Sequence, residues 1–161
     1  MKLKQLKALT LATAFAATGS VAGAAGPKEV QFDEYGAVAA SLTGAAGDAA
    51  NGAIVVGSKS QGNCVACHVV SALADVPFQG EVGPVLDGAG GRWSEAELRG
   101  LVANAKMTFD GTVMPAFYKV DGFIRPGDGY TGKAPTEALP PILSAQEIED
   151  VVAFLMTLTE E

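Results

Sequence analysis

Cys64-Val65-Ala66-Cys67-His68 is the most informative stretch of the 161-residue sequence. Two thiols on one helical turn can each add to a vinyl group of a porphyrin, and the next residue brings an imidazole nitrogen under the iron. This spacing is the attachment sequence of c-type haem. It predicts one covalent haem c, with Cys64 and Cys67 as thioether residues and His68 as an axial iron ligand.

Two other uses of a close cysteine pair fit the sequence less well. A thioredoxin-like redox pair belongs to an α/β pattern, which the sequence does not show. A structural zinc site needs four ligands, whereas the whole chain has two cysteines and one histidine. Haem attachment is therefore preferred over both.

The second axial ligand is predicted largely by elimination. His68 is the only histidine, and both cysteines are used for attachment, so methionine remains. Met156 lies in the last predicted helix, where methionine usually fills the core. Of the two others, Met114 precedes Pro115, which favours an extended backbone that can lay a thioether across the haem face. We predict Met114 as the ligand, with Met107 as the alternative. Histidine opposite methionine raises the iron potential and closes the site, which suits electron transfer.

The N-terminal segment has the pattern of an export signal. Three lysines within the first seven residues precede a weakly apolar run over 8–17, and small residues at 22–24 fit a cleavage site. About 20 apolar residues are needed to span a bilayer, and this run is shorter. We predict a signal peptide over residues 1–24 and a periplasmic mature protein with no membrane anchor after cleavage.

The charge of the mature chain excludes one class of partner. Cleavage removes three of the 11 basic residues and none of the 18 acidic ones, which leaves a net charge of −10. Nucleic-acid binding requires basic surface that releases counterions. A nucleic-acid partner is therefore excluded.

The remaining sequence predicts a small all-α domain. One helix is expected over residues 49–56, with Asp48 as its cap. Two more begin at Ser94 and Ser144, each with a glutamate three residues later that completes a capping box. Apolar residues recur on one face of the later helices, and no strand pattern of similar length occurs.

Long loops are expected to wrap the haem. Residues 69–91 and 105–141 are rich in glycine and proline. The second loop has 37 residues, too many for a simple connection, so we expect it to pack over something. With only 11 aromatic residues, the chain has few large side chains for a core, and a covalent macrocycle would supply the rest.

The mature chain divides into an arm over residues 25–46 and a domain over 47–161. The arm is rich in alanine and glycine, and we expect it to lie on the domain or on a partner. Its possible docking points are Val30 to Phe32 and Tyr35.

Several polar and backbone groups are candidates for the surroundings of the haem. A metal-bound histidine usually donates its second ring N–H to an oxygen, and a carbonyl near Pro84 can accept it, although an ordinary turn fits equally well. Four basic residues are candidates for the haem edge, although solvated surface charge is the preferred interpretation of each: Lys59, Arg92, Arg99 and Lys106.

The order of these motifs resembles class I cytochromes c over about residues 47–159. By that resemblance, Gly52 and Phe154 would meet where the terminal helices cross, with Gly52 allowing a close approach. A narrower resemblance is to the SoxX family of monohaem cytochromes. It rests on Gly-Asn-Cys-Val-Ala-Cys-His (62–68), Gly-Pro-Val-Leu (83–86), Gly-Gly-Arg-Trp-Ser (90–94), Glu-Leu-Arg-Gly-Leu-Val (97–102) and Thr-Val-Met-Pro-Ala-Phe-Tyr (112–118).

The SoxX resemblance implies an electron-transfer subunit of the periplasmic SoxAX complex. That complex, an L-cysteine S-thiosulfotransferase, joins thiosulfate to a cysteine of a sulfur-carrier protein and releases two electrons. The implied partners are a SoxA-like haem subunit in a heterodimer, the carrier protein, and a downstream electron-acceptor cytochrome. The resemblance places the catalytic haem in SoxA, so this chain alone is not expected to be catalytic. It also implies that Cys64 and Cys67 bind haem, and that His68 and Met114 ligate iron.

Two other functions remain open. A free-standing electron shuttle would explain the haem and the acidic charge, but not the arm or the long 105–141 loop. A haem sensor or peroxidase would require that Met114 does not ligate, and the single histidine leaves no distal acid–base residue of the usual kind.

Overall fold

The computed structural model describes residues 23–124, 126 and 131–160. The predicted signal peptide therefore lies outside the described residues, except for its last two positions. No described residue lies in a strand, and the all-α prediction is confirmed. Within the described part, no helix is long and apolar enough to cross a bilayer. In chain order, the elements are α1 (Ala49–Gly57), η1 (Cys64–Ala66), η2 (Ser71–Leu73), α2 (Ala89–Arg92), α3 (Glu95–Asn104), η3 (Ala105–Met107) and α4 (Ala145–Thr157), where η is a 3-10 turn.

The three long helices begin where their capping residues predict. The carboxylate of Asp48 accepts hydrogen bonds from the first turn of α1. Ser94 and Ser144 each form a complete capping box with the glutamate three residues later. These starts are local, because the side chain and the N–H groups it accepts from are within one turn.

The expectation that residues 69–91 are only loop is wrong at two places, η2 and α2. The short helix α2 contains Gly90 and Gly91, which are poor helix formers. Tertiary packing holds it: the Gly90 N–H donates to the Leu158 carbonyl at 2.8 Å, at the end of α4. A Cβ at Gly90 would lie 2.6 Å from the Met156 carbonyl oxygen, so only glycine fits this contact.

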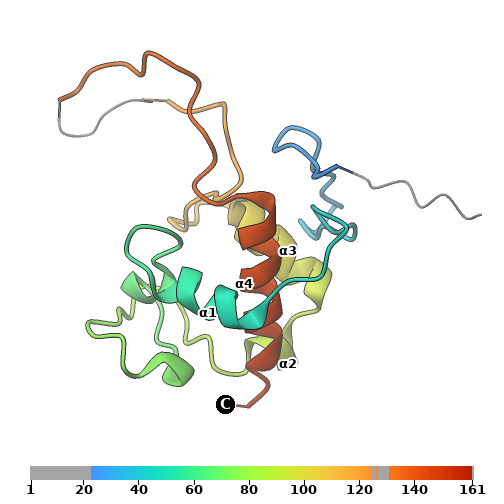
Figure 1. Cartoon of the computed structure of the whole chain (residues 1–161), viewed down its shortest axis with the longest axis vertical. Coiled ribbons are helices and arrows are strands. Elements are labelled where there is room, and N and C mark those ends of the chain that lie inside the picture. The colour runs from blue at the N-terminus through green and yellow to red at the C-terminus, as the bar shows by residue number, and fades with distance from the viewer. Residues whose placement is uncertain (1–22, 125, 127–130, 161) are drawn as a thin grey trace, which may run out of the picture.

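Helices α1 and α4 cross at a glycine, as the cytochrome resemblance predicts (Figure 1). A Cβ at Gly52 would lie 2.0 Å from the Asp150 carbonyl oxygen and 2.9 Å from the Phe154 Cβ. The missing side chain therefore lets the two backbones touch. Around this crossing the core is built from side chains of three helices: Val55, Val56, Leu98, Val102, Ile148, Val151, Val152 and Leu155.

The arm over 25–46 lies on the domain itself. Its anchors are Val38 and Leu42, both 2% exposed, and the Val38 N–H donates to the Ala96 carbonyl at 2.9 Å. Of the expected docking points, Val30 and Phe32 pack partly against the core, whereas Tyr35 is 72% exposed.

Arg99 is buried, so its interpretation as solvated surface charge is wrong. Its Nε donates to both oxygens of Glu149 on α4, at 3.0 and 3.1 Å, and its Nη1 donates to the Val38 carbonyl at 3.0 Å. Glu149 in turn accepts from the Leu42 N–H at 2.6 Å. The ion pair thus joins α3, α4 and the arm, and the arm keeps water away from it.

The 105–141 loop has two halves, up to and after residue 118, which pack differently. The first half packs over the helices and ends where the Phe117 carbonyl accepts a hydrogen bond from the Leu143 N–H at 3.0 Å. The described part of the second half extends away from the helices, and Ile124 is 98% exposed (Figure 1). The expectation of packing is therefore correct for the first half, whereas the described part of the second half contacts the arm through the Lys28–Asp121 ion pair and otherwise extends away from the helices.

Candidate functional site

A cavity of about 1030 Å³ lies between the Cys-x-x-Cys-His segment, the loop around Pro84, helices α3 and α4, and the first half of the 105–141 loop. Its volume is at the upper end of the roughly 300–1,000 Å³ of small-molecule and cofactor sites. All four predicted site residues, Cys64, Cys67, His68 and Met114, line it. The surrounding wall is mainly apolar and includes Val56, Leu98, Val102, Phe117, Val151 and Leu155. These residues fit a flat apolar macrocycle such as a porphyrin.

The 3-10 turn η1 presents both cysteines to the cavity. Asn63, in the left-handed region with φ 48°, starts the turn, and the N–H groups of Cys67 and His68 both donate to the Cys64 carbonyl at 3.0 Å. Burial raises the pKa of the Cys64 thiol to about 11, so this residue presents an uncharged sulfur. The spacing predicted from the sequence is thus realised as one turn, with His68 at its end.

The His68 ring is held by the segment around Pro84. Its Nδ1 lies 2.7 Å from the Pro84 carbonyl oxygen, which can only accept, so Nδ1 carries the proton and Nε2 is left for a metal. Of the two interpretations of Pro84, this contact favours the histidine acceptor over the ordinary turn. Gly83 lies directly against the ring, and its N–H donates to the Cys67 carbonyl at 2.7 Å.

Gly83→Ala is expected to displace the His68 imidazole. A Cβ at this position would lie 2.2 Å from Cε1 and 2.6 Å from Nδ1, so the ring would have to shift and strain its hydrogen bond to Pro84. The absorption spectrum of the holoprotein should show partial loss of the low-spin form, and the reduction potential should change. Gly26→Ala is the matched control, because this glycine lies outside the cavity lining and its added methyl group would meet only the side chain of Glu29, at 3.4 Å; it should leave both measurements unchanged. A normal spectrum for Gly83→Ala would refute this role of Gly83.

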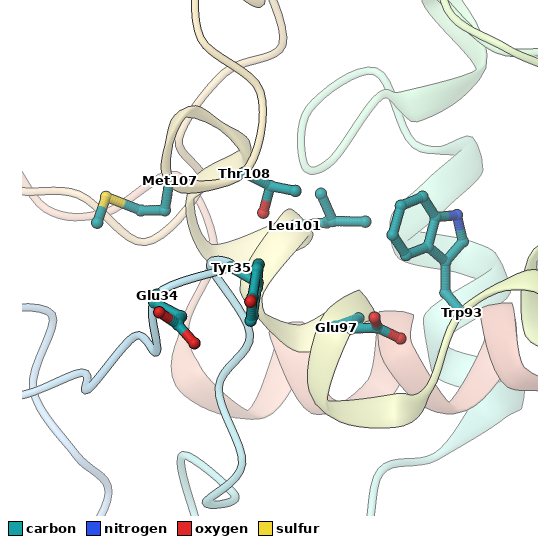
Figure 2. Close-up of a pocket in the computed structure, with 7 residues that line it drawn as sticks. All are labelled: Glu34, Tyr35, Trp93, Glu97, Leu101, Met107 and Thr108. Carbon is teal, nitrogen blue, oxygen red and sulfur yellow. The ribbon is translucent and has the colours of Figure 1, made fainter.

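The structure separates the candidate methionines. Met114 is partly buried against the core and lines the cavity, whereas Met107 is 48% exposed. Met107 instead lines a second pocket, of about 350 Å³, on the outer side of α3. Figure 2 shows it there with Glu34 and Tyr35. Met156 packs against the core and does not line the cavity. This placement favours Met114 over Met107 as the ligand.

Two of the four basic candidates contact the walls of the cavity. Arg92 lines it and donates to the carbonyls of Val85 at 3.1 Å and Asp87 at 2.7 Å. Lys106 donates from Nζ to the Met114 carbonyl at 2.6 Å. Lys59 is exposed and is not among the lining residues. The sequence placed Lys106 near the haem as one of four possibilities, but contained no signal for its contact with Met114.

Comparison with known proteins agrees with this geometry. Residues 49–159 match the cytochrome c family, and the chain belongs to it. A search of curated proteins found no match. The crystal structure of SoxXA from P. pantotrophus contains a chain that is 64% identical, with a TM-score of 0.81, over 85% of this chain and 99% of that one. Within the cytochrome c family, the chain is a SoxX-type electron-transfer cytochrome with one covalent haem c.

Proposed function

We propose that this protein is the electron-transfer subunit of a periplasmic thiosulfate-oxidising complex and works as a heterodimer with a SoxA-like haem subunit. The observation that carries this proposal is that Cys64, Cys67, His68 and Met114 all line one apolar cavity. It occurs in a chain that is 64% identical to one in a SoxXA crystal structure.

Each of the four residues has a distinct role in the proposed site. Cys64 and Cys67 would form the thioether bonds to a haem, and His68, through Nε2, and Met114, through its sulfur, would bind its iron. When bound, the haem supplies reversible one-electron chemistry. An iron held by both a histidine and a methionine of the protein would be suited to electron transfer rather than to oxygen or peroxide chemistry. The Pro84 carbonyl holds the imidazole proton at Nδ1. The apolar wall of the cavity would exclude water from a bound porphyrin.

The thiosulfate chemistry is assigned to the complex rather than to this chain. A carrier thiol and thiosulfate give a carrier thiosulfonate, with one new S–S bond, one proton and two electrons. Both cysteines of this chain are used for haem attachment, so none is left to carry sulfur. Its share is to take the two electrons one at a time from the SoxA-like subunit and pass them to a downstream cytochrome. It thereby serves as the redox subunit of an L-cysteine S-thiosulfotransferase.

The mouth of the cavity suits a closely docked redox partner. Three side chains that line the cavity are also exposed: Val82 at 72%, Val85 at 48% and Val113 at 80%. An exposed apolar rim of this kind is typical of a protein interaction site. A partner seated there would bring its own haem close to the edge of this one. The arm, which packs on its own domain, does not distinguish a subunit from a free shuttle.

Co-expression with a SoxA-like subunit and export to the periplasm test the proposal. We expect a one-to-one complex on size exclusion, cleavage near residue 24, and a haem adduct on the peptide that contains Cys64 and Cys67. Thiosulfate plus carrier protein should reduce the haem of this chain, and a carrier whose cysteine is replaced by serine should not. A lone monomer whose haem stays oxidised under these conditions would favour the free-standing shuttle instead.

A further inference from the structure

A lysine side chain is bonded to the backbone of the proposed methionine ligand. Lys106, in η3, donates from Nζ to the Met114 carbonyl oxygen at 2.6 Å. The bond joins the end of the α3–η3 segment to the loop that lies over the cavity. Charged donors make stronger hydrogen bonds to carbonyls than neutral donors do.

The loop around Met114 has few other attachments. Between residues 112 and 115, the other hydrogen bonds within the described part of the chain are short-range: Thr112 N–H to the Phe109 carbonyl at 3.3 Å, and Met114 N–H to Thr112 Oγ1 at 3.2 Å. Pro115 has no N–H to donate. Val113 is 80% exposed, so it contributes little burial. Beyond Pro115 the chain is next fixed to α3 at Tyr118, whose N–H donates to the Ala103 carbonyl at 3.0 Å. Within residues 112–115, the Met114 carbonyl is therefore the group that is hydrogen-bonded to the α3–η3 segment.

The backbone around Lys106 is well packed and hydrogen-bonded. Ala105, its neighbour, is 1% exposed, and the Lys106 N–H donates to Asn104 Oδ1 at 3.2 Å. The Phe109 N–H donates to the Ala105 carbonyl at 2.9 Å, which closes the turn after the lysine. The ammonium group is thus carried on a packed turn and can define the position of the residue that it binds.

We propose that Lys106 is a positioning residue that holds the Met114 thioether at the sixth coordination position of the haem. This inference rests on the proposed ligation by Met114 and adds the residue that keeps it in place. Loss of the bond would leave the loop free to move outward, and the iron would be open to outside ligands for a larger share of the time. The apparent affinity for such a ligand rises in proportion to that open fraction.

Titration of the ferric holoprotein with imidazole tests the proposal. In Lys106→Met, which keeps the length of the side chain but has no donor, imidazole should bind about 2- to 10-fold more tightly than in the wild type. Lys106→Arg keeps a charged donor and should restore most of the wild-type affinity. Lys59→Met removes the same charge from an exposed lysine outside the cavity lining and should change nothing.

Two further measurements distinguish a positioning role of Lys106 from a general effect on stability. The global unfolding midpoint should be similar in wild type and Lys106→Met, while the thioether–iron absorption band should disappear at a lower temperature in the variant. Equal imidazole affinities in Lys106→Met and wild type would overturn the proposal, and so would an equal increase in Lys59→Met. If Met114→Ala keeps the thioether–iron band, the ligation itself is wrong, which is a different outcome from failure of Lys106 alone.

Discussion

Met114→Ala is expected to open the iron site of the holoprotein. Met114 is the methionine that lines the cavity, and alanine has no atom that can reach a metal. The thioether–iron absorption band should vanish, and the low-spin spectrum should give way to an open or replaced sixth position. The reduction potential should fall by on the order of 100 mV or more, because a methionine ligand raises it. Spectroscopy and a redox titration measure both changes.

Met107→Ala is the matched control for this substitution. Met107 belongs to the same loop region, but it is 48% exposed and lines the outer pocket with Tyr35 (Figure 2). It should keep the absorption band and the potential of the wild type. Carbon monoxide should bind to reduced Met114→Ala and not to reduced Met107→Ala. The reverse pattern would mean that Met107 is the ligand.

Glu149→Ala is expected to destabilise the fold by about 3–5 kcal/mol, the usual cost of removing one member of a buried ion pair. The side chains of Arg99 and Glu149 are 3% and 4% exposed, and in the variant the buried Arg99 guanidinium would retain as its charged partner the largely exposed carboxylate of Glu95. The Leu42 N–H of the arm would also lose its acceptor. Chemical denaturation of the holoprotein measures the loss, and proteolysis within residues 25–46 should become faster as the arm detaches.

An exposed ion pair provides the comparison. Lys28 and Asp121 also join the arm to the domain, at 2.8 Å, but both side chains are more than 60% exposed. Asp121→Asn should leave the denaturation midpoint unchanged, because water and salt screen such pairs. Similar stabilities for Glu149→Ala and Asp121→Asn would show that the buried pair does not hold the arm.

The Arg99→Met, Glu149→Leu double variant separates pairing from burial. It replaces both charges with apolar side chains, and buried ion pairs exchanged in this way often retain stability. We expect it to be more stable than Glu149→Ala. A double variant as unstable as the single one would mean that the hydrogen bonds to Val38 and Leu42, rather than the loss of the buried carboxylate beside Arg99, carry the effect.

The sequence alone predicted a structural feature correctly wherever the interaction that forms this feature lies within one turn of the chain. The haem attachment segment brings Cys64 and Cys67 onto one 3-10 turn through hydrogen bonds to residues three and four positions away. The helix starts at Ser94 and Ser144 depend on a glutamate three residues later. Pro115 favoured Met114 over Met107 by restricting the backbone of its own neighbour, and the structure places Met114 at the cavity. Such patterns are visible in a sequence because their partners are close in it.

The tertiary structure decided what depends on residues far apart. Arg99 looked like a surface charge on an exposed helix face, but Val38, 61 positions earlier, and Glu149, 50 positions later, enclose it. The short helix α2 has no helical signal and forms because Gly90 fits against the end of α4. Lys106 was one basic residue among four until the loop brought the Met114 carbonyl to its ammonium group. Burial and long-range hydrogen bonds arise only when distant segments pack together, and no local pattern of residues records which segments those are.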